Sequence, residues 1–151
     1  MMAVDEHKGK IFASLFIIAN RLQVLGDRLD PDVTVKQWLL IAVIVKSYPG
    51  MLSVKDIASI VGVSHQNVMQ MVRSLEKKGF VHISIDESDR RIKRIGLTRK
   101  CQEYFAARGD RELAFLNDLF AGFSGDELQH FAVHIDHLIS NIMKMELRST
   151  T

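Results

Sequence analysis

Four serine or threonine residues stand in the same local setting, and that setting predicts where helices begin. Each has an apolar residue before it and another four positions later: Thr34, Ser53, Ser64 and Ser124. A hydroxyl there can accept hydrogen bonds from the free N–H groups of a first helical turn, and the apolar pair can pack across it. Gln37 and Glu127 also complete reciprocal capping boxes, whereas Asp56 and Asn67 fit that position more weakly. We therefore expect helices to begin at four defined points.

Hydrophobic spacing between these points predicts the other helices. Apolar residues recur every three or four positions in 5–25, and 34–48 is apolar nearly all round, which indicates a buried helix. Pro49-Gly50 ends that helix, Gly62 allows a tight turn between the next two, and Gly79 ends the second of them. The expected helices are 5–25, 34–48, 53–61, 64–78, about 98–121 with Gly109 as a weak point, and 124–147.

The periodicity then becomes strand-like. Val81, Ile83 and Ile85 alternate with polar residues, which predicts a strand with one buried face. The polar stretch 87–91 reverses the chain, and 92–97 returns as a second strand in which Ile92 is out of phase. The predicted fold class is therefore mainly α with a small β-hairpin wing, in the order helix, helix, helix–turn–helix, hairpin, helix, helix.

Size and composition limit the class of protein. The chain has 151 residues, fits one domain (1–151), and is 47% hydrophobic and 25% charged, an ordinary globular balance. The lone cysteine, Cys101, excludes an internal disulfide and indicates a reducing compartment. The N-terminal residues lack the apolar core of a signal peptide, and the longest apolar runs fall short of the roughly 20 residues that span a bilayer. We expect a soluble cytoplasmic protein without a membrane partner.

Positive charge is concentrated in one part of the sequence. Nine basic and four acidic residues lie between Arg73 and Lys100, a local net of +5 in a chain whose net charge is +2. A basic stripe within an otherwise slightly acidic chain is typical of proteins that bind a polyanion.

The segment 53–79 has the pattern of a helix–turn–helix. The residues expected to face inward are Ile57, Ala58 and Val61 in the first helix and Val68, Val72 and Leu75 in the second. The second helix then presents six polar residues to solvent: Ser64, His65, Gln66, Asn67, Gln70 and Arg73. Asn and Gln amides can pair with adenine through two hydrogen bonds, and an α-helix fits the major groove of B-DNA. On this helix alone, a merely solvated polar face explains the pattern equally well.

The hairpin turn is strongly basic. The charged residues that we single out there are Asp89, Arg90, Arg91, Lys93 and Arg94. A short exposed hairpin with four cations repels itself unless it has an anionic partner. Asp89 can hold a neighbouring guanidinium, and an arginine at a loop tip suits a narrow, electronegative minor groove. The hairpin therefore favours double-stranded DNA as the partner, with an arginine of the loop in the minor groove and the other cations on phosphates.

These motifs together resemble one known family. The string DESDRRIKRIGLT after a helix ending in LEKKGFV, in this order of elements, is similar to the MarR/SlyA family of bacterial and archaeal transcription regulators. The resemblance covers nearly the whole chain. It implies a winged helix-turn-helix over 34–98 and a helical dimerisation region over 5–30 and 99–147. It also implies that Asp89 positions Arg91 for the minor groove and that helix 64–78 reads the major groove.

The resemblance further implies a homodimeric repressor that a small molecule releases from DNA. Apolar residues of the first and last helices, more than one small wing domain can cover, also indicate a homodimer. No cofactor is expected; the effector would be a small aromatic or phenolic compound bound near Trp38 and the first helix. Family members often carry Arg or Lys where this chain has Gln70 and Ser74. The recognition helix is thus less cationic than usual, and more of the affinity falls to the wing.

Several alternatives stay open. His130, His134 and His137 share one edge of the last helix and could seat a metal in a metal-responsive regulator, although a solvated edge is the simpler interpretation. Cys101 could sense oxidants, although a packing role is simpler. A winged-helix module that binds other proteins is a further alternative. An enzyme is not expected, because the sequence has no Gly-rich phosphate loop and no clustered nucleophile and base.

Overall fold

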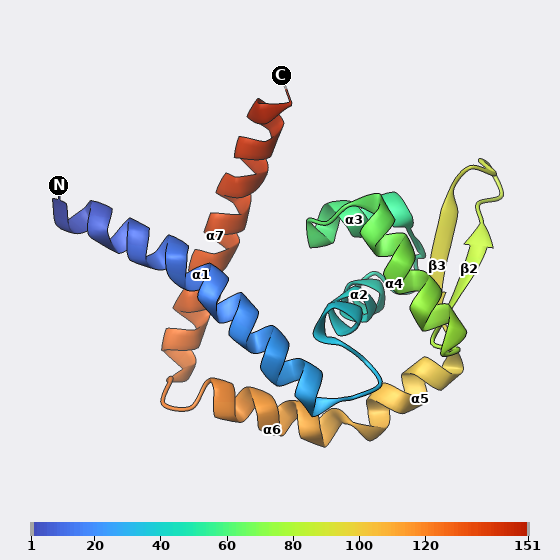
Figure 1. Ribbon diagram of the computed structural model, residues 1–151, viewed down its shortest axis with the longest axis horizontal. Helices are drawn as coiled ribbons and strands as arrows, with labels where there is room; N and C mark the ends of the chain where they lie inside the picture. The colour runs from blue at the N-terminus through green and yellow to red at the C-terminus, as the bar shows by residue number, and fades with distance from the viewer. Residues whose placement is uncertain (1, 151) are drawn as a thin grey trace. The chain divides into compact units, whose positions relative to one another are not determined.

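The computed structural model describes residues 2–150, so the two end residues of the predicted 1–151 domain lie outside the described part. Figure 1 shows a mostly helical chain with one small sheet. The chain divides into two units, residues 1–106 and 107–151. The elements in chain order are α1 (Met2–Leu29), α2 (Val35–Lys46), β1 (Leu52–Ser53), α3 (Val54–Val61), α4 (His65–Lys77), β2 (Val81–Ile85), β3 (Lys93–Leu97), α5 (Arg99–Ala107), α6 (Gly109–Leu119) and α7 (Gly125–Ser149).

The four predicted helix starts are confirmed. Thr34, Ser53, Ser64 and Ser124 each cap a helix, and each hydroxyl oxygen accepts the backbone N–H three residues later at 3.0–3.2 Å. Gln37 and Glu127 complete capping boxes, and so does Asp56, which the sequence had ranked as a weaker candidate. Asn67 does not complete a capping box, because only its backbone N–H takes part, as the donor to the Ser64 hydroxyl. Since these contacts are local, the chain specifies its helix starts independently of the remaining packing.

The core of the first unit lies between α2, α3, α4 and the sheet. In α4 the predicted inward residues Val68, Val72 and Leu75 are fully buried, and in α3 Ile57 is too. The further buried hydrophobic residues of this core are Val33, Leu40, Ile41, Ile44, Val54, Met69, Phe80, Val81, Ile95 and Cys101. Gly62, at a φ of 77°, adopts the left-handed conformation that turns α3 into α4. The helix–turn–helix is therefore confirmed.

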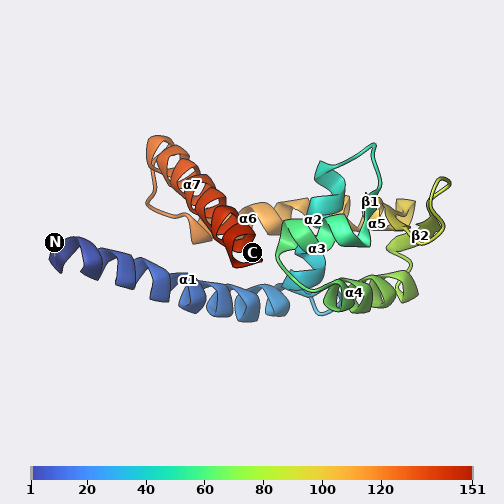
Figure 2. The ribbon, with the colours of Figure 1, turned by 90° about the horizontal axis from the view of Figure 1, so that it is seen from above.

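The hairpin is part of a three-stranded antiparallel sheet in the order β1-β3-β2. The two-residue strand β1 was not predicted; its Leu52 pairs with Ile95, which also pairs with Ile83 of β2. Ile92 is out of phase because it belongs to the turn: its N–H donates to Asp89 and its carbonyl accepts from Asp86, both at 2.9 Å. Ile85 is 62% exposed, so the predicted buried face of the first strand is wrong at that residue. The hairpin extends past the core (Figure 2).

Three expectations about the helices need correction. The first helix extends over Met2–Leu29 rather than 5–25. The helix predicted as buried all round, α2, packs only one side into the core, and its Trp38, Leu39 and Val45 are exposed. The stretch 98–121 forms α5 and α6 rather than one helix, because the chain leaves helical geometry at Arg108, beside the weak point Gly109.

The second unit consists of α6 and α7. Phe123, just before α7, contacts the rings of Phe120 and Phe131 edge-on, at centroid distances of 6.2 and 6.4 Å. Among residues 2–150, none of the helices combines the length and the apolar character that a bilayer span requires.

Candidate nucleic-acid interface

One face of helix α4 packs in the core, and the opposite face is exposed to solvent. All six residues predicted to face solvent, Ser64, His65, Gln66, Asn67, Gln70 and Arg73, are exposed. The opposite face carries the fully buried Val68, Val72 and Leu75. Because the anchor residues are rigidly packed, the helix presents its polar face in one fixed orientation. Base-reading residues require such a platform.

Ser74 lies off this exposed face. Its hydroxyl accepts a 3.1 Å hydrogen bond from the side-chain amide of Gln37, which is buried in α2. This hydrogen bond is a structural reason for a serine, rather than Arg or Lys, at position 74. Of the two departures from the family pattern, only Gln70 lies on the face that α4 presents.

The wing tip holds Arg91 in a two-pronged ion pair. Nε and Nη2 of Arg91 donate to the two carboxylate oxygens of Asp89, each at 3.1 Å, and the Arg91 backbone N–H donates to the same carboxylate at 3.0 Å. These hydrogen bonds from Arg91 lower the pKa of Asp89. The Arg91 side chain is nevertheless 90% exposed. The predicted pairing is confirmed, and it fixes the direction of the guanidinium while leaving it accessible.

Asp86 builds the turn that carries this pair. One carboxylate oxygen accepts the backbone N–H groups of Ser88 and Asp89 at 3.1 and 3.0 Å, and the other accepts from Nε of Arg94 at 2.8 Å. Hydrogen bonds from the Ser88 hydroxyl and from Arg94 hold the pKa of Asp86 well below its usual range. Sequence reasoning counted Asp86 only as a charge. The serine two positions later was a signal, since Asp commonly accepts from the backbone two residues on.

Arg94 differs from the other cations of the wing. Its side chain is 32% exposed, and besides Asp86 it contacts the Met51 carbonyl at 3.2 Å and the Asp56 carboxylate at 3.9 Å. Arg90 and Lys93 are exposed, as predicted. The sequence grouped all four cations together, and the structure separates Arg94 from the rest.

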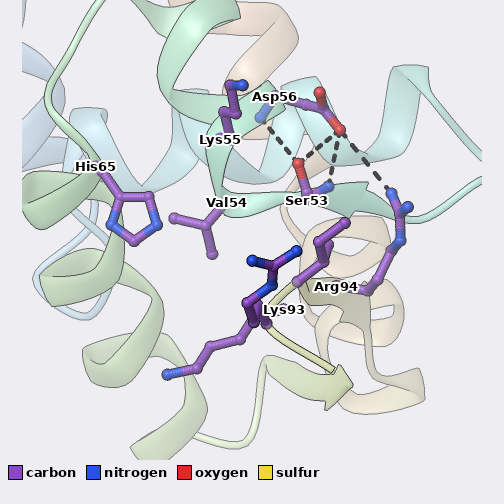
Figure 3. Close-up of a pocket in the computed structure, with 9 residues that line it drawn as sticks. Ser53, Val54, Lys55, Asp56, His65, Lys93 and Arg94 are labelled. Atoms are coloured by element: carbon purple, nitrogen blue, oxygen red, sulfur yellow. Dashed lines mark hydrogen bonds and ion pairs between the residues drawn. The ribbon is translucent and has the colours of Figure 1, made fainter. Parts of the chain in front are cut away.

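A hollow of about 480 Å³ lies between the wing and the two helices of the helix–turn–helix. Figure 3 shows side chains from the start of α3, the start of α4 and β3 around it, including Lys55, His65 and Lys93. Arg91 also lines it. Lys55 of α3 thus shares one concave surface with Arg91 and Lys93 of the wing, an arrangement that suits a phosphate backbone.

The histidine edge of α7 and Cys101 were the candidates for a metal site and an oxidant sensor. His130, His134 and His137 are exposed along α7, and within residues 2–150 no three His, Cys, Asp or Glu side chains gather in a way that could hold a metal ion. Cys101 is buried, and this burial raises the pKa of its thiol to about 11. Since the thiolate is the reactive form, the burial of Cys101 favours a packing role over an oxidant sensor.

Several known proteins are similar to this chain in sequence and in fold. A family model described as the MarR family matches residues 32–92. The transcriptional activatory protein BadR of Rhodopseudomonas palustris is 23% identical over 145 residues, covering 93% of this chain and 83% of BadR. Among solved structures, a MarR/EmrR family regulator from Acinetobacter sp. ADP1 is similar with a TM-score of 0.78, 22% identity, and coverage of 93% of this chain and 98% of that one.

A second solved structure, the complex of S. aureus MepR with DNA, is similar with a TM-score of 0.74 and 22% identity. It covers 86% of this chain and 97% of MepR. At these identities the likeness establishes the fold, mostly helical with a small antiparallel sheet.

Proposed function

We propose that this chain, whose residues 32–92 match the model of the MarR family, is a member of that family and a sequence-specific DNA-binding transcription regulator that acts as a homodimer. One observation carries the proposal. A helix anchored by a fully buried face presents Gln and Asn side chains, and next to it Arg91 is oriented by Asp89 while 90% exposed. These two features have the chemistry that the two grooves of B-DNA require.

In this proposal α4 enters the major groove. Its amides at positions 66, 67 and 70 contact base edges, and Arg73 contacts a phosphate. The wing reaches the adjacent minor groove with Arg91, while Arg90 and Lys93 contact phosphates. A regulator of this kind acts on chromosomal DNA in the cytoplasm.

The homodimer rests on exposed apolar surface. In α1 Ile11, Phe12, Phe16 and Ile18 are each at least half exposed, and α7 exposes Phe131, Ile139 and Ile142. Large exposed apolar faces on helices are typical of interfaces between chains. A two-fold dimer would place two copies of α4 in successive major grooves, about 34 Å apart, on a pseudo-palindromic site. Sedimentation of a monomer at micromolar concentration would contradict this part.

We also propose that a small aromatic or phenolic effector modulates DNA binding. Trp38 and Leu39 are exposed on α2, so the chain offers an apolar surface close to the helix–turn–helix that an aromatic ring can cover. A thermal-shift panel of aromatic acids tests this. A compound that binds should also change the affinity for DNA, and an effector that shifts stability alone would not support regulation.

The central experiment starts with selection of bound sequences from random duplex DNA. The selected duplex is then titrated with wild type, Arg91→Ala and Arg99→Ala. The Arg99 side chain is also 90% exposed and ion-paired, but it lies at the start of α5 rather than in the wing. Arg91→Ala should weaken binding by at least about 1 kcal/mol, roughly fivefold, and Arg99→Ala should leave it almost unchanged. Absence of binding to any duplex at low salt would refute the proposal and favour a protein-binding module.

A further inference from the structure

We propose that Arg94 is a positioning residue that clamps the wing to the start of α3 and thereby sets where Arg91 meets DNA. The group formed by Arg94, Asp86, Asp56 and the Met51 carbonyl is called the wing clamp below. The inference rests on the DNA-binding function proposed above, and it adds a role to a residue that the basic composition of the wing would assign to a phosphate.

The position of Arg94 in the sheet lets one side chain join three segments. It lies in the central strand β3, opposite Ser84 of β2 and Ser53 of β1. Its guanidinium reaches Asp86 at the wing turn, Asp56 in the first turn of α3, and the backbone carbonyl just before β1 (Figure 3 shows the contact with Asp56). The clamp therefore connects the outer part of the hairpin to a helix packed in the core.

The wing needs such a connection because apolar packing stops before its tip. Ile95 is fully buried, whereas Ile85, nearer the turn, is 62% exposed. A two-stranded hairpin without a packed face is only marginally stable in water. The side chains that fix the outer half of the hairpin are therefore polar, and among them Arg94 reaches from the hairpin to α3.

The clamp is also linked to the DNA-contacting end of the wing. Asp86 accepts the backbone N–H of Asp89 at 3.0 Å, and the Asp89 carboxylate holds the guanidinium of Arg91. A continuous chain of charge-assisted hydrogen bonds thus runs from Arg94 through Asp86 and Asp89 to Arg91. Without the ion pair between Arg94 and Asp86, the turn can change its orientation, and Arg91 no longer has one fixed position relative to α3.

Direct phosphate binding by Arg94 is disfavoured by the same contacts. Its Nε already donates to a carboxylate at 2.8 Å, and its side chain is 32% exposed, against 90% for Arg91. A phosphate that bound Nε of Arg94 would displace Asp86 and break the turn. Asp86→Asn separates the two roles, since an Asn oxygen can still accept the N–H groups of Ser88 and Asp89 while the ion pair with Arg94 is lost.

The test measures affinity for the selected duplex by fluorescence anisotropy over a range of salt. Removing a negative charge should tighten binding if only net charge mattered. The clamp predicts the opposite sign: Asp86→Asn weakens binding about fivefold or more. It also predicts that Asp86→Asn adds little once Arg91→Ala is present, because both changes remove the same minor-groove contact.

Arg94→Met and Lys93→Met form a matched pair of neighbouring cation removals. Log affinity falls with log salt, and Lys93→Met should make this slope less steep by about 0.9, the value for one lost phosphate contact. Arg94→Met should leave the slope unchanged. In the free protein, hydrogen exchange at the Ile92 amide should accelerate in Asp86→Asn and Arg94→Met, while exchange at Val72 in α4 stays slow and reports that the core is folded.

The outcomes separate the two proposals. Equal or tighter binding by Asp86→Asn, a slope change in Arg94→Met equal to that in Lys93→Met, or unchanged exchange at Ile92 would each overturn the clamp. Failure of the wild type to bind any duplex would overturn the proposed function instead, and the exchange measurement would still decide whether the clamp holds the wing.

Discussion

The hydrogen bond between Gln37 and Ser74 offers a sharp test of how the recognition helix is held. Gln37 is 7% exposed, and its amide group serves two helices. Its oxygen accepts the Thr34 N–H at 3.2 Å and so completes the cap of α2, while its nitrogen donates to the Ser74 hydroxyl in α4 at 3.1 Å. Ser74→Ala removes the acceptor and leaves a buried amide N–H without this partner.

The expected cost follows from two opposing effects. A buried donor left unsatisfied destabilises a protein by about 1–3 kcal/mol. Alanine favours a helix over serine by roughly 0.5 kcal/mol, which offsets part of that cost. Ser74→Ala should therefore lower the free energy of unfolding by about 1–2 kcal/mol. Ser59→Ala in α3 is the matched control, because Ser59 is an exposed helical serine and its replacement gains only helix propensity.

Urea denaturation at one fixed protein concentration measures both variants, since a dimer would make stability depend on concentration. DNA affinity at 25 °C should be unchanged in Ser74→Ala, because residue 74 lies off the exposed face of α4. A Ser74→Ala protein as stable as Ser59→Ala would show that the hydrogen bond does not hold α4. Weaker DNA binding without loss of stability would place residue 74 at the DNA surface instead.

Three further predictions concern other parts of the chain. Gly26→Ala should lower stability by about 1–3 kcal/mol in urea denaturation, because its new methyl group would collide with the Val35 side chain where α1 approaches α2; unchanged stability would refute this tight contact. Cys101, whose pKa is raised to about 11, should react with a disulfide reagent at pH 8 far more slowly in the native protein than in urea, and equal rates would contradict its burial. The folded-state pKa values of Asp86 and Asp89 lie below the ordinary 3.8, so their stabilisation of the wing is present above that pH and is lost as pH falls below it. Protection of the wing amides against hydrogen exchange, relative to the rate of an unprotected amide at the same pH, should fall below about pH 4 before that of α4, and simultaneous loss of both would refute the reasoning.

Features that depend on neighbouring residues were predictable from the sequence. The hydroxyl caps at the four helix starts need contacts only three residues away, and the inward faces of α3 and α4 follow from helical spacing. The Asp89–Arg91 pair spans two residues and was predicted for the same reason. Each of these features depends on residues within one short segment, so the sequence of that segment is enough to predict it.

Features that depend on distant residues were missed. Arg94 and Arg91 look alike in the sequence, but the partners of Arg94 come from three separate segments, two of them about 40 residues earlier in the chain. Strand alternation predicted which face Ile85 occupies and gave no sign that the core ends before it. Likewise, the apolar character of α2 could not show that Trp38 and Leu39 lie outside the core of this chain.

Charge is unevenly distributed between α4 and the wing, the two elements that we propose to contact DNA. From Ser64 to Gln70 the start of α4 carries no Lys or Arg, whereas the wing exposes Arg90, Arg91 and Lys93. Ionic contacts weaken steeply with salt, and amide contacts with bases do so much less. In a cell whose internal salt rises during osmotic stress, such a regulator would leave its sites sooner while keeping the same preference among them.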